Sequence, residues 1–265
     1  MTSAEPSRRF AGHDPARGRD TARMPWAGRE VTPSPFAADD GRADEAVRRA
    51  LARVVASAPA DAAAAEADAL AVLAGSRLLM PIVAEAAASQ GRVADDADSD
   101  MASIVLNAPD GRRGMPAFTG IDTLTAWEPS ARPVPVRVAD AARAALEDGC
   151  EAMPLDLGAP HAVVLRLSHL WALGQERPWV PPADDPVVAE ALARVTAAHG
   201  AITGVEAQDA SDRAPGLVRL VLTLVPGLAA PDIQRLVGAV GEALAGDPDV
   251  RVRVDDVTVQ VRPGV

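Results

Sequence analysis

The chain has 265 residues, which is enough for one large domain or for two ordinary domains, each with its own hydrophobic core. Hydrophobic residues make up 48% of the chain, as in folded proteins, although aromatic residues make up only 3%. The formal net charge is −11, so most of the surface should repel a polyanion, and nucleic acid is not an expected partner. All 26 basic residues are arginine, which indicates a bias toward GC-rich codons rather than phosphate recognition.

Residues 1–35 are rich in Arg, Pro, Gly and Ser and have no apolar periodicity, which predicts a disordered N-terminal arm. Met1–Arg29 carries a local charge of +3, so an arm that touches nucleic acid is an alternative, which the −14 of the remaining residues disfavours. No stretch approaches the ~18 apolar residues that cross a bilayer, and the N-terminus lacks an apolar signal segment. We therefore expect a cytoplasmic protein without a membrane span.

Residues 36–176 are predicted to form a first domain that begins with two helices and a strand. The first helix spans about 43–56 and should bury one stripe of residues, namely Val47, Ala50, Leu51, Val54 and Val55. The second begins near Glu66 and ends at Gly75. A strand follows over 78–83, and its Pro81 predicts an edge strand or a bulge, because proline cannot donate to a ladder.

A hairpin and a short helix follow. The apolar runs 102–106 and 115–118 flank Pro109-Asp110-Gly111, which is a turn signal. After Phe118 the period changes: Ile121, Leu124 and Trp127 share one helical face, and Pro129 ends the helix.

The rest of the first domain is predicted as a strand over 134–138, a helix over 140–148, and two strands over 152–155 and 162–165. Ser168 is expected to N-cap the last helix, which carries Leu170, Trp171 and Leu173. Residues 177–184 include three prolines within a short stretch and predict a linker, with Trp179 packing between the two domains.

Residues 185–265 predict a second domain that opens with a helix at Pro186. Extended runs at 202–207 and 217–225 precede a helix over 231–246. Valine alternation at 250–254 and again at 257–261 predicts two final strands. The fold class is therefore α/β to α+β, with two domains that each hold a small mixed or antiparallel sheet covered by helices.

The metal and phosphate motifs that we tested are incomplete. Asp96, Asp98 and Asp100 match the start of a calcium loop, but Met101 and Asn107 stand where it needs Gly and Glu, so a solvated loop fits better. The run 238–241 has the spacing of a GxxG nucleic-acid clamp without basic residues, and close helix packing explains its glycines better. Neither a P-loop nor a GxGxxG fingerprint occurs.

The nucleophile candidates also favour structural roles. Cys150 is the only cysteine, which excludes an internal disulfide, and its acidic neighbours do not activate a thiol, so we interpret it as a small apolar filler. Ser168 and His169 are adjacent on a helix and should point apart. The four histidines are too scattered for a metal set and are expected at the surface or at strand ends; they are His13, His161, His169 and His199.

Several motifs together resemble the SseB family, the bacterial "enhanced serine sensitivity" family whose N-terminal domain is often labelled a type III secretion regulator. These motifs are Pro25-Trp26-Ala27-Gly28-Arg29, Arg77–Val83, Asp110-Gly111-Arg112-Arg113, Pro116–Gly120, Trp127-Glu128-Pro129 and Arg132-Pro133. Trp179–Pro182 is similar to the actinobacterial-type members, and the part after Asp184 resembles the family's C-terminal domain in the order of its elements. The resemblance implies a bacterial cytoplasmic protein and brings no catalytic residues.

The expected function is that of a non-catalytic interaction or regulatory protein with a protein partner, without catalytic, cofactor or metal residues. The alternative is a sensor of small molecules such as amino acids or nucleotides, or a weak enzyme. It would use a groove above the central sheet, with Arg112 and Arg113 as anion contacts.

Overall fold

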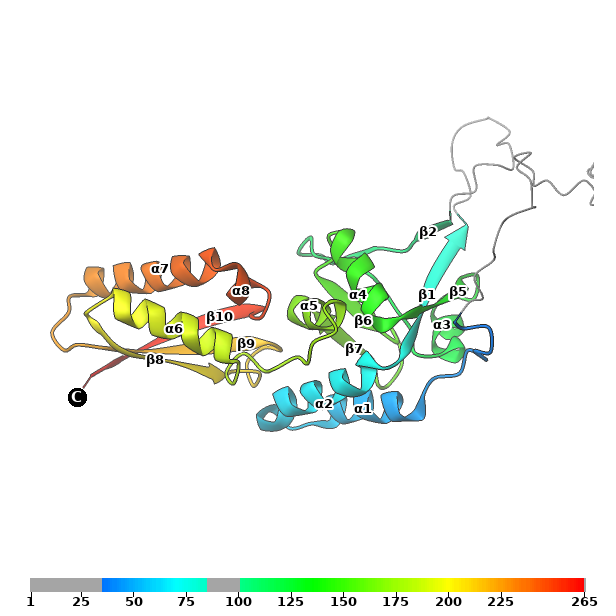
Figure 1. Cartoon of the computed structure of the whole chain (residues 1–265), viewed down its shortest axis with the longest axis horizontal. Coiled ribbons are helices and arrows are strands. Elements are labelled where there is room, and N and C mark those ends of the chain that lie inside the picture. The colour runs from blue at the N-terminus through cyan, green and yellow to red at the C-terminus, as the bar shows by residue number, and fades with distance from the viewer. Residues whose placement is uncertain (1–34, 85–100, 265) are drawn as a thin grey trace, which may run out of the picture. The chain divides into compact units, whose positions relative to one another are not determined.

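The structure, a computed structural model shown in Figure 1, describes residues 35–84 and 101–264. Almost all of the predicted N-terminal arm, His13, and the acidic run with Asp96, Asp98 and Asp100 lie outside the described residues. In the part that is described, no helix combines the length and the apolar character needed to cross a membrane.

Helices and small sheets alternate along the described chain, which confirms the α+β class. The helices are α1 (Glu45–Ala56), the 3-10 helix η3 (Pro59–Asp61), α2 (Ala62–Ala74), α3 (Ile121–Trp127), α4 (Val138–Glu147), α5 (Leu167–Gly174), α6 (Pro186–Ala198), α7 (Ala230–Gly246) and α8 (Pro248–Arg251). The strands are β1 (Arg77–Ala84), β2 (Met101–Ser103), β3 (Leu106–Asn107), β4 (Arg113–Gly114), β5 (Arg132–Arg137), β6 (Ala152–Leu155), β7 (Val163–Arg166), β8 (Ile202–Asp209), β9 (Leu217–Leu224) and β10 (Asp256–Pro263). They form three sheets, with strand orders β2-β1-β5, β3-β4-β6-β7 and β10-β9-β8.

Strand β1 is the centre of its sheet, so the edge position predicted from Pro81 is wrong. Pro81 lies opposite Pro133 of the antiparallel strand β5. Leu79 exchanges both backbone hydrogen bonds with Phe118, on the side away from β5. Because backbone groups alternate sides along a strand, Pro81 also faces away from β5, and no β1–β5 ladder bond is lost. The central strand β1 tolerates this proline because the missing N–H would point away from β5, to the side where, among the described residues, only β2 and Phe118 pair with the strand.

The turn at Pro109-Asp110-Gly111 is confirmed, but the two predicted runs do not pair with each other: the turn joins β3 to β4, whereas β2 pairs with β1. Gly111 has a φ of +86°, a conformation that glycine adopts without steric cost. After β4 the chain stays extended and joins two sheets: the N–H of Ala117 is bonded to the carbonyl of Pro154, and that of Phe118 to Leu79. This connection delivers the chain to α3, which spans the predicted residues.

The first part of the chain packs around a main hydrophobic cluster that draws on α1, α2, α4, α5 and both of its sheets, and a smaller cluster joins Leu79, Phe118 and Leu124. Val47, Ala50 and Leu51 of the predicted α1 stripe are buried, but Val55 exposes 53% of its surface. Val55 lies in the last turn of α1, and the predicted stripe was one residue too wide there. Another cluster fills the C-terminal part, between α6, α7 and the β10-β9-β8 sheet. The division of the chain at residues 177–184 remains a prediction.

The C-terminal sheet has helices on one face. Figure 1 shows α6 and α7 lying along the same side of β8, β9 and β10, and the buried residues of β9 that face them alternate, as Val218, Leu220, Leu222 and Leu224. β8 is antiparallel to β9, whereas β10 is parallel to it. The predicted helix start at Pro186 is confirmed, with Asp185 as the N-cap residue.

The strand predicted over 250–254 is wrong, because Val250 and Arg251 lie in the short helix α8 and the next two residues form the turn that ends it. The carboxylate of Asp247 accepts hydrogen bonds from the N–H groups of Asp249 and Val250, and Pro248 occupies the first helical turn. Asp-Pro is thus the same helix start as at Asp185-Pro186, and it overrides the valine alternation.

Gly238 and Gly241 lie inside α7, which rules out the loop that a GxxG clamp requires. A Cβ added at either glycine would meet nothing within 4 Å. The close helix packing predicted for them is therefore wrong, and Gly241 instead borders an open groove.

Candidate functional site

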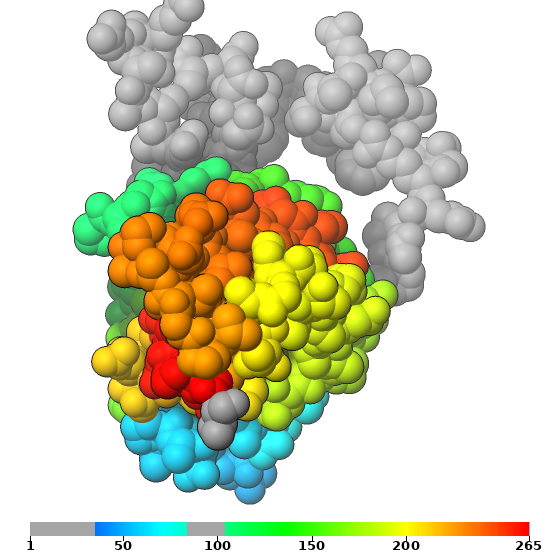
Figure 2. All heavy atoms as spheres, turned by 90° about the vertical axis from the view of Figure 1, so that its left-hand side faces the viewer, coloured from blue at the N-terminus to red at the C-terminus, as the bar shows by residue number. Residues whose placement is uncertain are grey.

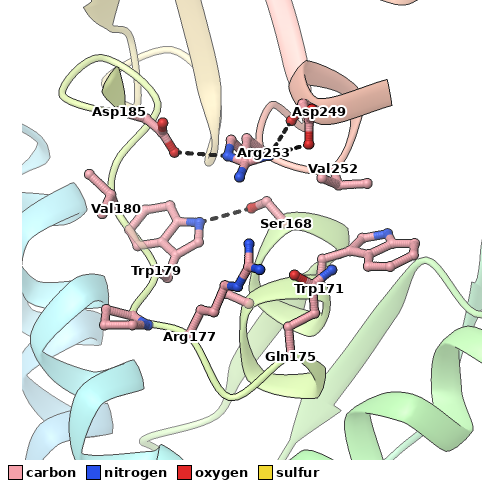
Figure 3. A pocket seen from close by; sticks show the side chains of 12 residues that line it. Ser168, Trp171, Gln175, Arg177, Trp179, Val180, Asp185, Asp249, Val252 and Arg253 are labelled. Atoms are coloured by element: carbon pink, nitrogen blue, oxygen red, sulfur yellow. Dashed lines mark hydrogen bonds and ion pairs between the residues drawn. The ribbon is translucent and has the colours of Figure 1, made fainter. Parts of the chain in front are cut away.

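The candidate site is a small pocket of about 90 Å³ beside the C-terminal end of α5 (Figure 3). Its walls come from α5, from the proline-rich segment that follows, and from the α8 region. The lining residues are Ser168, Trp171, Ala172, Gln175, Arg177, Pro178, Trp179, Val180, Asp185, Asp249, Val252 and Arg253. The volume suits a small metabolite and excludes a folded partner.

The two arginines of the pocket differ in their partners. Arg253 lies 3.3 Å from Asp185 and donates 2.6 Å to the carbonyl of Asp249, so its charge is compensated within the chain. Arg177 has no ion pair among the described residues. Figure 3 shows its guanidinium and the side chain of Gln175 pointing toward the centre of the pocket, beneath Ser168 and Trp179. The site therefore presents one uncompensated cation and one amide.

Ser168 and Trp179 form one wall of the pocket, and hydrogen bonds hold Ser168 in place. Ser168 is not the N-cap residue that we predicted. Helix α5 begins one residue earlier, and Ser168 lies inside its first turn. Its N–H and its hydroxyl each donate 2.8 Å to the carboxylate of Asp255, which lies just before β10. Asp255 thus satisfies one free N–H group of the helix start, that of Ser168, from a distant part of the chain. Trp179 donates its indole N–H to the Ser168 hydroxyl at 3.2 Å.

A buried ion network centred on Arg166 adjoins Ser168, because both residues bond to Asp255. The guanidinium donates two parallel hydrogen bonds to Glu66 on α2, at 2.7 and 2.8 Å, and a third to Asp255 at 2.9 Å. Burial on its own would lower the pKa of Arg166, but the two carboxylates raise it instead. Gly216 is packed against this arginine, and a Cβ there would come within 2.4 Å of Nε, so only glycine fits.

His169 is fully buried, so its predicted place at the surface or at a strand end is wrong. Its Nε2 lies 2.9 Å from an Nη of Arg166, and its ring packs edge-on against Trp179 at 4.7 Å. Burial, together with the positive charge of Arg166, lowers the pKa of the imidazole well below its usual value. The neutral ring accepts from Arg166, and a second proton would place two cations in contact.

A second buried carboxylate, Asp156, organises the start of α3. It is completely buried and accepts four hydrogen bonds: from the N–H and the hydroxyl of Thr119, from the hydroxyl of Thr123, and from Nε2 of His161, at 2.7–3.1 Å. Its φ of +51° is one that aspartate tolerates better than most residues. Asp156 therefore holds the Thr119-Gly120 corner and has no free acceptor for a substrate.

The remaining sequence candidates do not converge. Cys150 is buried in the main cluster, and burial raises the pKa of its thiol, as suits an apolar filler. Arg112 is paired with Asp110 at 2.7 Å, and Arg113 donates to the carbonyl of Asp148. Neither arginine lines the pocket. His199 lies at the end of α6. Within the described ranges, no group of three His, Cys, Asp or Glu side chains could hold a metal ion.

Sequence reasoning missed the residues with the strongest contacts. Arg166 and Asp156 are charges inside apolar strand patterns, and that signal could have singled them out as buried. Their partners, Glu66, Asp255 and Thr123, lie 33 to 100 residues away, so no local pattern names them.

Residues 47–172 match the family model of the SseB protein N-terminal domain. This is just under half of the chain, and it contains Asp156, Arg166 and the first turn of α5. The chain therefore carries an SseB-like domain, as the motif resemblance predicted. No curated protein and no solved structure matches the chain.

Proposed function

We propose that the chain is a non-catalytic, cytoplasmic, bacterial member of the SseB family that acts by binding. In this proposal residues 36–176 are the N-terminal domain, 177–184 the linker and 185–265 the family's C-terminal domain, of the actinobacterial type. A protein partner is the main occupant of its surface.

One observation carries this proposal: among the described residues, the buried Asp156 and Arg166 are satisfied by partners inside the chain. Asp156 has four internal donors, and Arg166 is bonded to both Glu66 and Asp255. A catalytic acid or base needs a free atom that faces a substrate, and the pKa of such a group is matched to proton transfer. The pairs described above are arranged for stability instead.

A second candidate function rests on Arg177. A guanidinium without an ion pair in the described part of the chain, next to an amide and between tryptophan-lined walls, suits a carboxylate, which it can bind through two parallel hydrogen bonds. The Asp249 side chain, 73% exposed on the same rim, could meet an amino group. Small carboxylates, free amino acids among them, are therefore the class of ligand that we propose for this pocket.

Thermal unfolding of the full chain against a panel of amino acids and other small carboxylates tests the pocket. A ligand at ~100 times its Kd should stabilise the fold by about 2.7 kcal/mol. The shift should vanish in Arg177→Gln and persist in Arg132→Gln, which removes an exposed arginine of β5 outside the pocket. A ligand that stabilises both variants equally would rule out Arg177 as its contact.

Affinity capture from the bacterium that produces the chain tests the partner. The proposal expects one protein at a fixed stoichiometry, with retention that survives the Arg177→Gln change. A chain that captures only small molecules, and turns none over, would leave the sensor function in its place.

A further inference from the structure

Strand β10 is an edge strand whose outer side has no partner among the described residues. It pairs with β9 along its whole length, from Asp256 to Pro263, without a register shift. The opposite edge, β8, contains a register shift between Ile202 and Gly204 and carries Glu206 in its centre. Bulges and charges are the features that keep sheet edges from pairing with other chains. β8 has both of them, and the centre of β10 has neither.

The backbone of β10 offers donors on this open side. Gly264, just after the strand, donates its N–H to the carbonyl of Leu224 on β9. Because N–H groups alternate sides along a strand, those of Val261 and Val259 point away from β9. The N–H of Val257 is already bonded to the carboxylate of Asp256 at 2.8 Å. Two donors, at Val259 and Val261, therefore remain on the open edge.

The side chains along the same edge are apolar. Val257 and Val261 expose 40% and 38% of their surfaces, which makes them two of the most exposed large hydrophobic residues in the described chain. They point to the side of the sheet that α7 covers. Figure 2 shows atoms of β10, in red, at the surface beneath α7, in orange. A groove of about 670 Å³ borders the start of β10 and is lined by Leu244, Ala245, Val254 and Val257, among others.

We propose that β10 pairs in antiparallel fashion with β10 of a second copy of this chain, with Val259 opposite Val259. In this register each Val257 faces the other copy's Val261, so the exposed valines cover one another. Each Asp256 faces the other copy's Arg262, which pairs with Glu206 of its own chain at 2.7 Å, so the carboxylate of the second copy would be a further partner of that guanidinium. The strand is thus complementary to itself, as a two-fold interface requires, and the pairing extends the three-stranded sheet to six strands.

The choice of a second copy rests on this charge and side-chain complementarity. No residue of β10 lines the pocket with Arg177, so this proposal is independent of the proposed function.

Sedimentation velocity of the full chain over a range of concentrations tests the pairing. The weight-average mass should rise toward twice the 27.3 kDa of one chain. Val261→Pro should abolish the rise in mass, because it removes an N–H that the second copy would accept from. The variant should still fold, since an edge strand tolerates a proline whose nitrogen faces outward. Val261→Lys should weaken association by about tenfold or more. Val164→Lys, at a residue 53% exposed on β7, is the matched control and should leave association unchanged.

A cross-link tests the register. Val259→Cys should form a disulfide between copies under mild oxidation, because the two residues oppose each other at about 5.5 Å between Cα atoms. Gln260→Cys, which faces Thr258 of the second copy, should cross-link much less. A chain that stays monomeric at every concentration would overturn the proposal. So would a folded Val261→Lys variant that dimerises with the affinity of the unchanged chain, or equal cross-linking at both positions.

Discussion

Two buried polar residues show how single side chains hold this molecule together. Asp156 ties Thr119, Thr123 and His161 together at one corner, and Arg166 joins Glu66 to Asp255. A buried charge that loses one partner is left unpaired, and such losses cost several kcal/mol. These residues therefore matter to the fold before they matter to any function.

His169 makes the stability depend on pH. Its pKa is lowered in the folded chain by burial and by Arg166, whereas in the unfolded chain it should lie near the ordinary value of about 6.5. Between the two values the unfolded state binds the extra proton, so the stabilisation is complete above about pH 6.5 and falls as the pH drops. The expected slope is about 1.4 kcal/mol per pH unit.

Urea unfolding between about pH 5 and pH 7 measures this slope. His169→Gln keeps an acceptor near Arg166 but cannot titrate, so its stability should change much less over the same range. His199→Gln, at the end of α6, is the control and should keep the slope of the unchanged chain. An equal slope in all three proteins would show that another group is responsible.

At the scale of elements, β1 shows how prolines enter the middle of a sheet. Pro81, Pro133 and Pro135 all lie at positions of the β1–β5 pair that face away from the shared ladder. Met80 and its partner Val134 occupy the bonded positions between them. Whether a strand tolerates a proline therefore depends on which neighbouring strand the backbone nitrogen faces.

This alternation gives a direct prediction for β1. Pro81→Ala should change the free energy of unfolding by less than about 1 kcal/mol, since no ladder bond depends on that position. Met80→Pro should cost about 2 kcal/mol more than Met80→Ala, because it removes a backbone donor in addition to the buried side chain. Denaturant unfolding of the three variants measures the difference. If Met80→Pro and Met80→Ala were equally stable, the ladder assignment would be wrong.

Local patterns predicted most elements and few of their contacts. The turn at Asp110-Gly111 and the helix Ile121–Trp127 were found from residues that lie next to each other. The strand predicted over 250–254 is wrong because Asp247-Pro248 starts a helix, and this capping signal outweighs the alternation of valines. Asp255 capping α5 could not be predicted, because its partners Arg166 and Ser168 lie nearly 90 residues earlier.

At the scale of the whole molecule, Asp255 links the segment before β10 to α5 and, through Arg166, to α2. It accepts from Ser168 twice and from Arg166 once. The exposed neighbour Asp256 bonds only to the N–H of Val257 among the described contacts. The two adjacent aspartates thus differ in role while sharing their chemistry.

Asp255→Asn should lower the free energy of unfolding by about 3 kcal/mol, since it leaves the charge of Arg166 only partly compensated. Asp256→Asn is the matched control and should stay within about 0.5 kcal/mol of the unchanged chain. Urea unfolding followed by tryptophan fluorescence reports both, because Trp179 is bonded to Ser168 in the same cluster. Similar losses in the two variants would remove the special role of Asp255.

The central claim is that this chain binds and does no chemistry. Mass spectrometry can follow a metabolite mixture, rich in small carboxylates, in large excess over the protein and over several hours. The account predicts that no component falls by more than one equivalent of protein, and that any loss reflects binding that Arg177→Gln removes. Continuous loss of one component beyond that equivalent, absent from the same mixture without protein, would contradict it.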